Sequence, residues 1–190
     1  MSRAAANSPT DEELVRLVAA GQGELFAELH ARYYARAFRL AWAMTGRRDA
    51  AEELTQEIFL RAWQKVGQFR GESSFGTWFY QVATRCCLNF RQKLPTAYES
   101  LDAIEFLAHP SAMKQIEARI EQQELQHEVQ RALLSLKPDW RMVVILKDLE
   151  GLSYDEIAAR MDCSAGTVAS RLNRARALLA RKLAHLREIN

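Results

Sequence analysis

Apolar residues recur every three or four positions along most of the chain, which is typical of amphipathic helices. The rhythm is clearest over 75–93 and 164–183, and no segment has the strict alternation that a half-buried strand requires. Further helices are predicted over 10–20, 24–44, 49–66, 121–136, 138–149 and 154–161. The predicted fold class is therefore all-α, with two small helical bundles joined by a linker.

Capping residues support several of these boundaries. Thr10 with Glu13, and Asp49 with Glu52, have the spacing of a capping box. Ser164 is a good N-cap for the last long helix. The turn before it requires a left-handed backbone conformation, which the Asp162 found there tolerates better than most residues.

Composition suggests where the domains divide. Residues 1–9 are small and polar and are expected to be disordered, and 10–95 forms the first domain. Residues 96–120 lack a clear apolar stripe and are assigned to a linker, with at most one short helix. The second domain spans 121–190.

The second domain ends in a short helix, a tight turn and a basic helix, which together favour a DNA-binding helix-turn-helix. One face of the basic helix is apolar, whereas the opposite edge carries hydroxyl and guanidinium groups that suit base edges and phosphates. The candidate contacts with duplex DNA on this edge are Ser164, Thr167, Ser170, Arg171 and Arg174.

Charge supports that interpretation. Residues 163–190 hold six basic side chains and one acidic side chain, whereas 121–162 hold five basic and nine acidic ones. The formal net charge of +2 therefore hides a basic stripe, as expected for a helix that binds a duplex. The alternative is an ordinary amphipathic helix with a solvated basic face.

The helix over 75–93 interleaves aromatic rings with Arg, Asn and Gln, a combination suited to single-stranded nucleic acid. Aromatic residues at helical spacing also form cores, and this explains Phe75, Phe79 and Phe90. Tyr80 and one edge of Trp78 are the better candidates for contact with bases. Cys86 lies on the apolar stripe, so we expect it in the core.

The helix over 49–66 has a second, polar surface. Glu53, Gln56 and Glu57 lie apart from its apolar face, with Phe59 and Trp63 at a further edge. Such a polar and aromatic surface favours a protein partner, although a solvated acidic face is the alternative.

Composition excludes several other classes. The 190-residue chain has 48% hydrophobic residues but no apolar run long enough to span a membrane, and residues 1–14 lack the core of a signal peptide, so a cytoplasmic protein is expected. The three cysteines lack CxxC spacing and the four histidines are scattered. No metal site, cofactor or catalytic residue is predicted.

Taken together, these motifs resemble the bacterial extracytoplasmic-function (ECF) sigma factors of the sigma-70 family. The resemblance rests on AAEELTQEIFLRAW (50–63) and FRGESSFGTWFYQVAT (69–84) in the first domain. In the second it rests on LLSLKPDWRMVVILKDLEGLSYDEIAARM followed by CSAGTVASRLNRAR. It implies a non-enzymatic, promoter-specificity subunit of RNA polymerase.

The resemblance also implies roles for individual residues. Binding to the beta-prime clamp helices of core polymerase is implied for Glu52, Glu53, Gln56, Glu57 and Phe59. Opening the minus-ten element is implied for Gln68, Phe69, Arg70, Ser73, Trp78, Tyr80, Gln81 and Arg85. The five duplex-contacting residues would read the minus-thirty-five element. The polymerase beta flap, promoter DNA and an anti-sigma factor are the other implied partners.

The chain departs from the family pattern in three places: at Arg85, at Asp162 where the family commonly has Gly, and at 50–53, which read Ala-Ala-Glu-Glu in place of the usual Asp-Ala-Glu-Asp. Arg85 stands where many relatives have Asn, so the minus-ten preference of those relatives does not transfer to this chain.

Two alternatives stay open at this point. The first is a stand-alone helix-turn-helix regulator whose first domain senses a ligand or dimerises. The second is a redox-controlled version of either protein, with Cys86, Cys87 or Cys163 as the switch.

Overall fold

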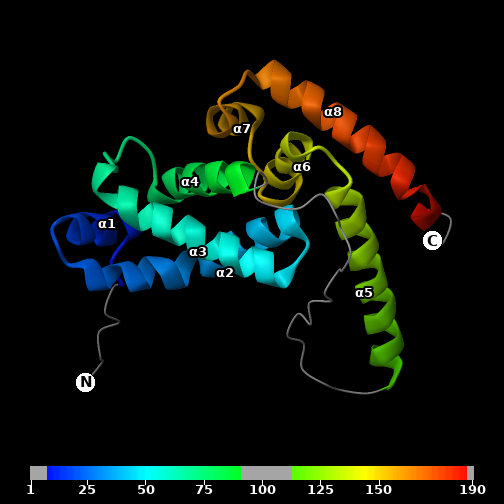
Figure 1. The fold of residues 1–190 in the computed structure, drawn as a ribbon, viewed down its shortest axis with the longest axis horizontal. Coiled ribbons are helices and arrows are strands. Elements are labelled where there is room, and N and C mark those ends of the chain that lie inside the picture. The colour runs from blue at the N-terminus through cyan, green and yellow to red at the C-terminus, as the bar shows by residue number, and fades with distance from the viewer. Residues whose placement is uncertain (1–7, 91–112, 188–190) are drawn as a thin grey trace, which may run out of the picture.

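A computed structural model describes residues 8–90 and 113–187, with side chains described over 8–90 and 124–186 (Figure 1). The described residues form helices and turns, without a β-strand among them. The N-terminal half consists of α1 (Asp11–Ala19), η1 (Gly23–Leu25), α2 (Phe26–Thr45), α3 (Arg48–Lys65), η2 (Val66–Gln68) and α4 (Phe75–Phe90). The C-terminal half consists of α5 (Met113–Leu134), α6 (Pro138–Val144), the π-helical turn η4 (Ile145–Leu149), α7 (Tyr154–Met161), α8 (Ala165–Lys182) and η5 (Ala184–Arg187).

An aromatic cluster holds the N-terminal half together. The ring of Phe79 lies 5.0 Å from that of Tyr33 and 5.2 Å from that of Phe59, and Phe75 lies 5.3 Å from Tyr33. The Tyr33 hydroxyl donates a hydrogen bond to Asp11, which ties α1 to α2. These contacts fix α4 against α2 and α3.

In the C-terminal half, α8 packs against α6 and α7 through the apolar stripe that the sequence predicts (Figure 1). Val168, Leu172 and Ala175 are fully buried, together with Ile157 of α7. The edge opposite this stripe, which carries the exposed Ser170 and Arg174, consequently points to solvent.

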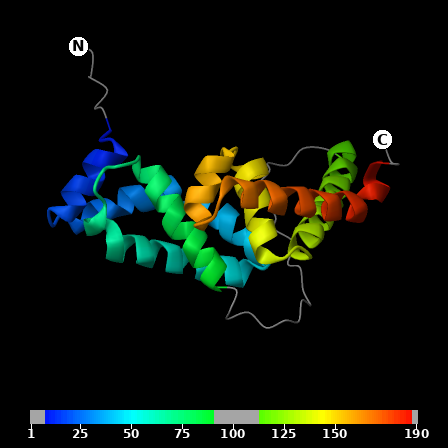
Figure 2. The same cartoon turned by 90° about the horizontal axis from the view of Figure 1, so that it is seen from above.

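The two halves share one core. Helix α4 contacts α6 and α7 on one side and α3 on another, as the two views of the fold show (Figures 1 and 2). Helix α2 contacts α5 and α6 as well. The two predicted bundles are therefore both present, and their buried residues form a single continuous cluster.

Local signals predicted several helix ends correctly. Thr10 and Glu13 form the expected capping box, and the Ser164 hydroxyl caps α8 by accepting a hydrogen bond from the Thr167 backbone N–H at 3.1 Å. Asp162 has a φ of 50°, which places it in the left-handed region as predicted.

Other local predictions were wrong. Helix α3 begins at Arg48, so Asp49 lies inside its first turn and pairs with Arg47, while Glu52 pairs with Arg48 at 2.9 Å instead of closing a capping box. Helix α5 begins at Met113, inside the predicted linker. The predicted disorder of 1–7 and the predicted helix end at 91–95 lie outside the described residues.

The left-handed turn at Asp162 yields a stability prediction. Glycine adopts this conformation without the steric cost that a Cβ atom imposes. Asp162→Gly is therefore expected to raise the free energy of unfolding by about 0.5 kcal/mol, and Asp162→Ala to lower it by about 0.5–1 kcal/mol. Urea unfolding followed by circular dichroism measures both, and equal stabilities for the two variants would contradict the backbone assignment.

Candidate nucleic-acid and polymerase interfaces

Two of the predicted DNA contacts, Ser164 and Thr167, form hydrogen bonds that stabilise the first turn of α8. The Ser164 hydroxyl lies 2.9 Å from the Thr167 hydroxyl as well as capping the helix. Both residues fix where α8 begins, and their hydroxyls lie at the helix terminus, where backbone N–H groups favour anions such as phosphate.

Acidic side chains flank the basic face of α8. Arg171 is half-buried and pairs with Asp139 of α6 at 3.3 Å, and Arg176 pairs with Asp148 of η4 at 2.5 Å. The outward centre of the helix is formed instead by the exposed residues Ser170, Asn173 and Arg174. Asn173 was not among the DNA contacts predicted from the sequence. Its angular position opposite the buried stripe could have identified it.

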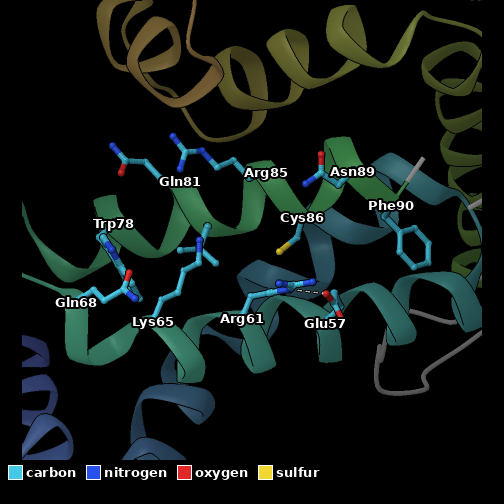
Figure 3. Close-up of a pocket in the computed structure, with 11 residues that line it drawn as sticks. Glu57, Arg61, Lys65, Gln68, Trp78, Gln81, Arg85, Cys86, Asn89 and Phe90 are labelled. Carbon is cyan, nitrogen blue, oxygen red and sulfur yellow. Dashed lines mark hydrogen bonds and ion pairs between the residues drawn. The ribbon is translucent and has the colours of Figure 1, made fainter. Parts of the chain in front are cut away.

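Half of the predicted single-strand contacts line a groove between α3 and α4. The groove has a volume of about 380 Å³, and Figure 3 shows its side chains. Four predicted residues line it: Gln68, Trp78, Gln81 and Arg85. The structure thus brings half of the predicted minus-ten set to one site.

Further groove residues were not selected from the sequence as nucleic-acid contacts. Arg61 and Lys65 come from α3 and Asn89 from α4. Glu57 lines the groove too and pairs with Arg61 at 2.8 Å (Figure 3). Their helical spacing, with Glu57, Arg61 and Lys65 four residues apart, is the signal that could have grouped them.

The loop before α4 is anchored by an aromatic ring. Phe69 is half-buried and packs edge-on against Phe75 at 6.0 Å and Trp78 at 5.7 Å. Arg70 and Ser73 are exposed on either side of Gly71, which has a φ of 73°. Phe69 therefore positions the loop, and the two polar residues face solvent.

Tyr80 lies apart from the groove. Its ring is 8% exposed, and its hydroxyl donates a hydrogen bond of 2.7 Å to Glu150 of the C-terminal half. Burial, together with this carboxylate, raises the pKa of Tyr80 far above that of a free tyrosine. The structure thus places this predicted base contact beneath the other half of the protein.

The polymerase-facing surface predicted on α3 is present in part. Glu53 and Gln56 are exposed, but Phe59 is 6% exposed and its ring lies 4.2 Å from that of His30, so the prediction of an exposed Phe59 was wrong. Phe59 turns inward because the adjacent aromatic cluster offers more apolar contact than the rim does. Leu60 and Trp63, 51% and 44% exposed, continue the exposed face instead.

Cys86, which was expected in the core, is only half-buried, and it packs against the edge of the core. Cys87 is buried at 2% exposure, whereas Cys86 lines the groove (Figure 3). A helix rotates 100° per residue, so the two neighbours point in different directions, with Cys86 at the edge of the predicted apolar face and Cys87 on a face covered by the C-terminal half. Burial raises the pKa of the Cys86 thiol to about 11, which disfavours the reactive thiolate.

Comparison with known proteins identifies the family. The family described as Sigma-70 region 2 matches residues 29–94, and Sigma-70, region 4 matches residues 126–179. The chain is 37% identical over 181 residues to the ECF RNA polymerase sigma-E factor of Escherichia coli (strain K12), covering 92% of this chain and 94% of that protein. The chain belongs to the ECF sigma factors.

A second relative of this sigma factor supports the same assignment. The RNA polymerase sigma-H factor of Pseudomonas aeruginosa is 31% identical over 180 residues, which cover 91% of this chain and 93% of the relative. The groove lies within the region 2 match, and α7 with most of α8 lies within the region 4 match.

Solved structures of sigma factors share the fold. RpoE in complex with the anti-sigma factor NepR from Bartonella quintana superposes with a TM-score of 0.65 at 21% identity, covering 84% of this chain and 96% of that one. CnrH in complex with the cytosolic domain of CnrY also gives 0.65, at 23% identity, covering 92% and 97%.

Sigma factors are non-catalytic initiation factors, and this protein is a sigma subunit for transcription initiation that binds RNA polymerase core and promoter DNA. Within the described residues, none of the helices has the length and apolar character needed to cross a membrane.

The raised pKa of Cys86 predicts how its reactivity depends on pH. Only the thiolate reacts with alkylating reagents, so labelling of Cys86 should rise about tenfold per pH unit from pH 7 to 10. A peptide cysteine should level off above about pH 8.5. Mass spectrometry of alkylated peptides measures both rates. A plateau for Cys86 below pH 9 would contradict the raised pKa and revive the redox-switch hypothesis.

Proposed function

We propose that α8 reads the minus-thirty-five element as duplex DNA in the major groove. The observation that carries this assignment is the exposed line Ser170, Asn173 and Arg174 on a helix whose opposite face is buried. An Asn amide pairs with adenine and an Arg guanidinium with guanine, so this line offers two base-reading groups. Ser164 and Thr167 are proposed to bind phosphate at the helix start. Arg171 is proposed to leave its ion pair with Asp139 and to bind DNA instead.

We propose that the groove between α3 and α4 holds the non-template strand of the melted minus-ten element. Trp78 offers a ring for stacking, Gln68 and Gln81 offer amides, and Arg85 offers a cation for phosphate. Arg70 and Ser73 extend this surface along the loop that Phe69 anchors. Tyr80 is proposed to join the strand-binding surface when the two halves separate.

We propose that the exposed face of α3 binds the beta-prime clamp helices of core polymerase. Glu52, Glu53 and Gln56 supply its polar part, and Leu60 with Trp63 supplies the apolar centre that protein interfaces favour. Glu57 is proposed to act in the groove, because it already pairs with Arg61.

The remaining proposals concern organisation and partners. We propose that 10–95 and 121–190 act as the two functional domains, and that the beta flap is the polymerase contact of the second. The shared fold with RpoE, which binds the anti-sigma factor NepR, supports an anti-sigma partner for this chain. Because its proposed partner polymerase works in the bacterial cytoplasm, the protein is proposed to act there.

Transcription in vitro on a genomic fragment library tests the promoter-specificity role. We expect core polymerase with this protein to produce new transcripts whose start sites share two spaced elements, and core alone to lack them. Binding of the protein alone to a symmetric operator, without new start sites, would instead support a stand-alone regulator.

Arg174 provides a test of the upstream assignment. If it makes a good base contact, Arg174→Ala should weaken promoter selection by about 1–3 kcal/mol and relax specificity at one upstream position. Arg131→Ala removes another exposed guanidinium, from α5, and serves as the control. Competition transcription with variant promoters measures both, and equal losses for the two variants would point to a non-specific charge effect.

The α3 face is tested separately. The double variant Glu53→Lys with Gln56→Ala should weaken binding to core polymerase at least tenfold, because it reverses one charge and removes an adjacent amide. Helical content should stay unchanged, since both side chains are exposed. Glu24→Lys, an exposed charge reversal on η1, is the control. Fluorescence anisotropy with labelled protein gives both affinities, and unchanged binding by the double variant would reject this face.

A further inference from the structure

The first turn of α1 supplies a hydrogen-bond acceptor to the first turn of α4, 63 residues further along the chain. The first N–H groups of a helix have no partner inside it. The Ser74 hydroxyl accepts the Thr77 N–H at 3.2 Å, as a local cap does. The Phe75 N–H instead donates to the carboxylate of Glu12 at 3.1 Å. The start of α4 is therefore capped by two acceptors from different parts of the chain.

The neighbouring carboxylate, that of Asp11, supports the same turn of α4 through α2. It accepts hydrogen bonds from the Arg32 guanidinium at 2.7 Å and from the Tyr33 hydroxyl. This hydroxyl lies against Gly76, because a Cβ atom added to the glycine would be 3.1 Å from it. The small size of Gly76 thus lets α4 begin directly against a tyrosine that α1 holds in place.

Both ends of the loop over 69–74 rest on α1. Helix α1 packs against η2, which ends immediately before this loop, and against α4, which begins immediately after it (Figure 2). Val66 of η2 is buried, whereas Arg70 and Ser73 within the loop are exposed. The loop is therefore open to solvent at its centre and held at both ends by the same helix.

Two successive acids of α1 have different hydrogen-bond partners. Glu13 closes the capping box of α1 itself, since its carboxylate accepts the Thr10 N–H at 2.8 Å. Glu12 accepts the N–H of another helix. Both side chains are exposed, and the next two residues, Leu14 and Val15, are buried in the core and fix α1 in place. Glu13 therefore offers a natural comparison for Glu12.

We propose that Glu12 is a positioning residue for capture of the melted strand: it holds the loop over 69–74 and the start of α4 in the geometry that presents Arg70 and Ser73 to the bases. This proposal rests on the proposed strand-binding function of the loop and the groove. Recognition groups must be held within a fraction of an ångström of their productive positions. Glu12 adds neither a cation nor a stacking ring, so its effect should fall on base selectivity.

Three variants separate the possible roles of Glu12. Glu12→Ala removes both the acceptor and the charge. Glu12→Gln removes the charge but keeps an oxygen that can accept the Phe75 N–H. Glu13→Ala shortens the adjacent acid by the same amount and breaks the capping box of α1, so it is the matched control for a weakened α1.

Hydrogen exchange of the free full-length protein, followed by NMR, tests the anchor. Glu12→Ala should raise the exchange rate of the Phe75 amide about tenfold, because the amide loses its acceptor. Glu12→Gln and Glu13→Ala should leave that rate close to the wild-type value. An unchanged rate in Glu12→Ala, or an equal increase in Glu13→Ala, would overturn the specific anchor.

Binding of fork-junction DNA to polymerase holoenzyme tests the positioning role. One probe carries the single-stranded minus-ten element found by the library transcription, and a second probe has one base of that element replaced. Fluorescence anisotropy gives the ratio of the two Kd values. Glu12→Ala should reduce this ratio severalfold without weakening the binding of core polymerase, whereas Glu12→Gln and Glu13→Ala should retain the wild-type ratio.

The possible outcomes are distinct. Equal loss of selectivity in Glu12→Ala and Glu12→Gln would indicate an effect of charge and overturn the positioning role, as would unchanged selectivity alongside faster exchange of Phe75. If no minus-ten element emerges, or if wild-type holoenzyme does not distinguish the two probes, the proposed strand-binding function fails and the positioning role fails with it. The exchange rates still decide in that case whether Glu12 anchors α4.

Discussion

The double burial of α4 is the constraint on which the arrangement of this protein depends. One side of the helix completes the aromatic cluster of the N-terminal half through Phe75 and Phe79. A second side, around Tyr80, is covered by α6 and α7. The groove that faces α3 is left between them. Because the helix is a rigid cylinder, each surface fixes the orientation of the others.

The electrostatics of α8 follow from its placement on α6. Packing of Val168 and Leu172 brings the helix close to Asp139 and Asp148, and these acids pair with Arg171 and Arg176. Such partly exposed pairs stabilise the protein only slightly, by about 0–1 kcal/mol each. Their larger effect is to hold the guanidiniums of Arg171 and Arg176 at the edges of the helix. The solvent-facing centre of α8 is therefore formed by Ser170, Asn173 and Arg174.

The sequence predicts those features that depend on neighbouring residues. The cap at Thr10, the cap at Ser164 and the left-handed Asp162 all involve residues within three positions of each other, and all three are confirmed. Helical rhythm likewise predicts the buried stripe of α8. Asp49 does not cap α3, because its carboxylate pairs with the nearby Arg47 guanidinium. The capping pattern in the sequence does not take such a pair into account.

Features that depend on distant residues could not be predicted in this way. Phe59 is buried because His30 and Phe79 meet it from other helices. Tyr80 and Cys87 are buried on a face of α4 that looks polar in sequence, since a single helix gives no sign of a partner 70 residues away. The groove combines residues of two helices and a turn, so neither helix alone reveals it.

The hydrogen bonds of Arg141 indicate how the halves would separate. Its guanidinium donates to the carbonyls of Leu133, Leu134 and Leu136 within the α5–α6 elbow, and to the Met44 carbonyl of α2. Separation would break the bond to Met44, while the bonds within the elbow could stay in place. A buried cation that lost all its acceptors would cost several kcal/mol. Retention of the elbow bonds makes rigid-body movement of the C-terminal half less costly in free energy than its unfolding, so α8 would keep its shape in both arrangements.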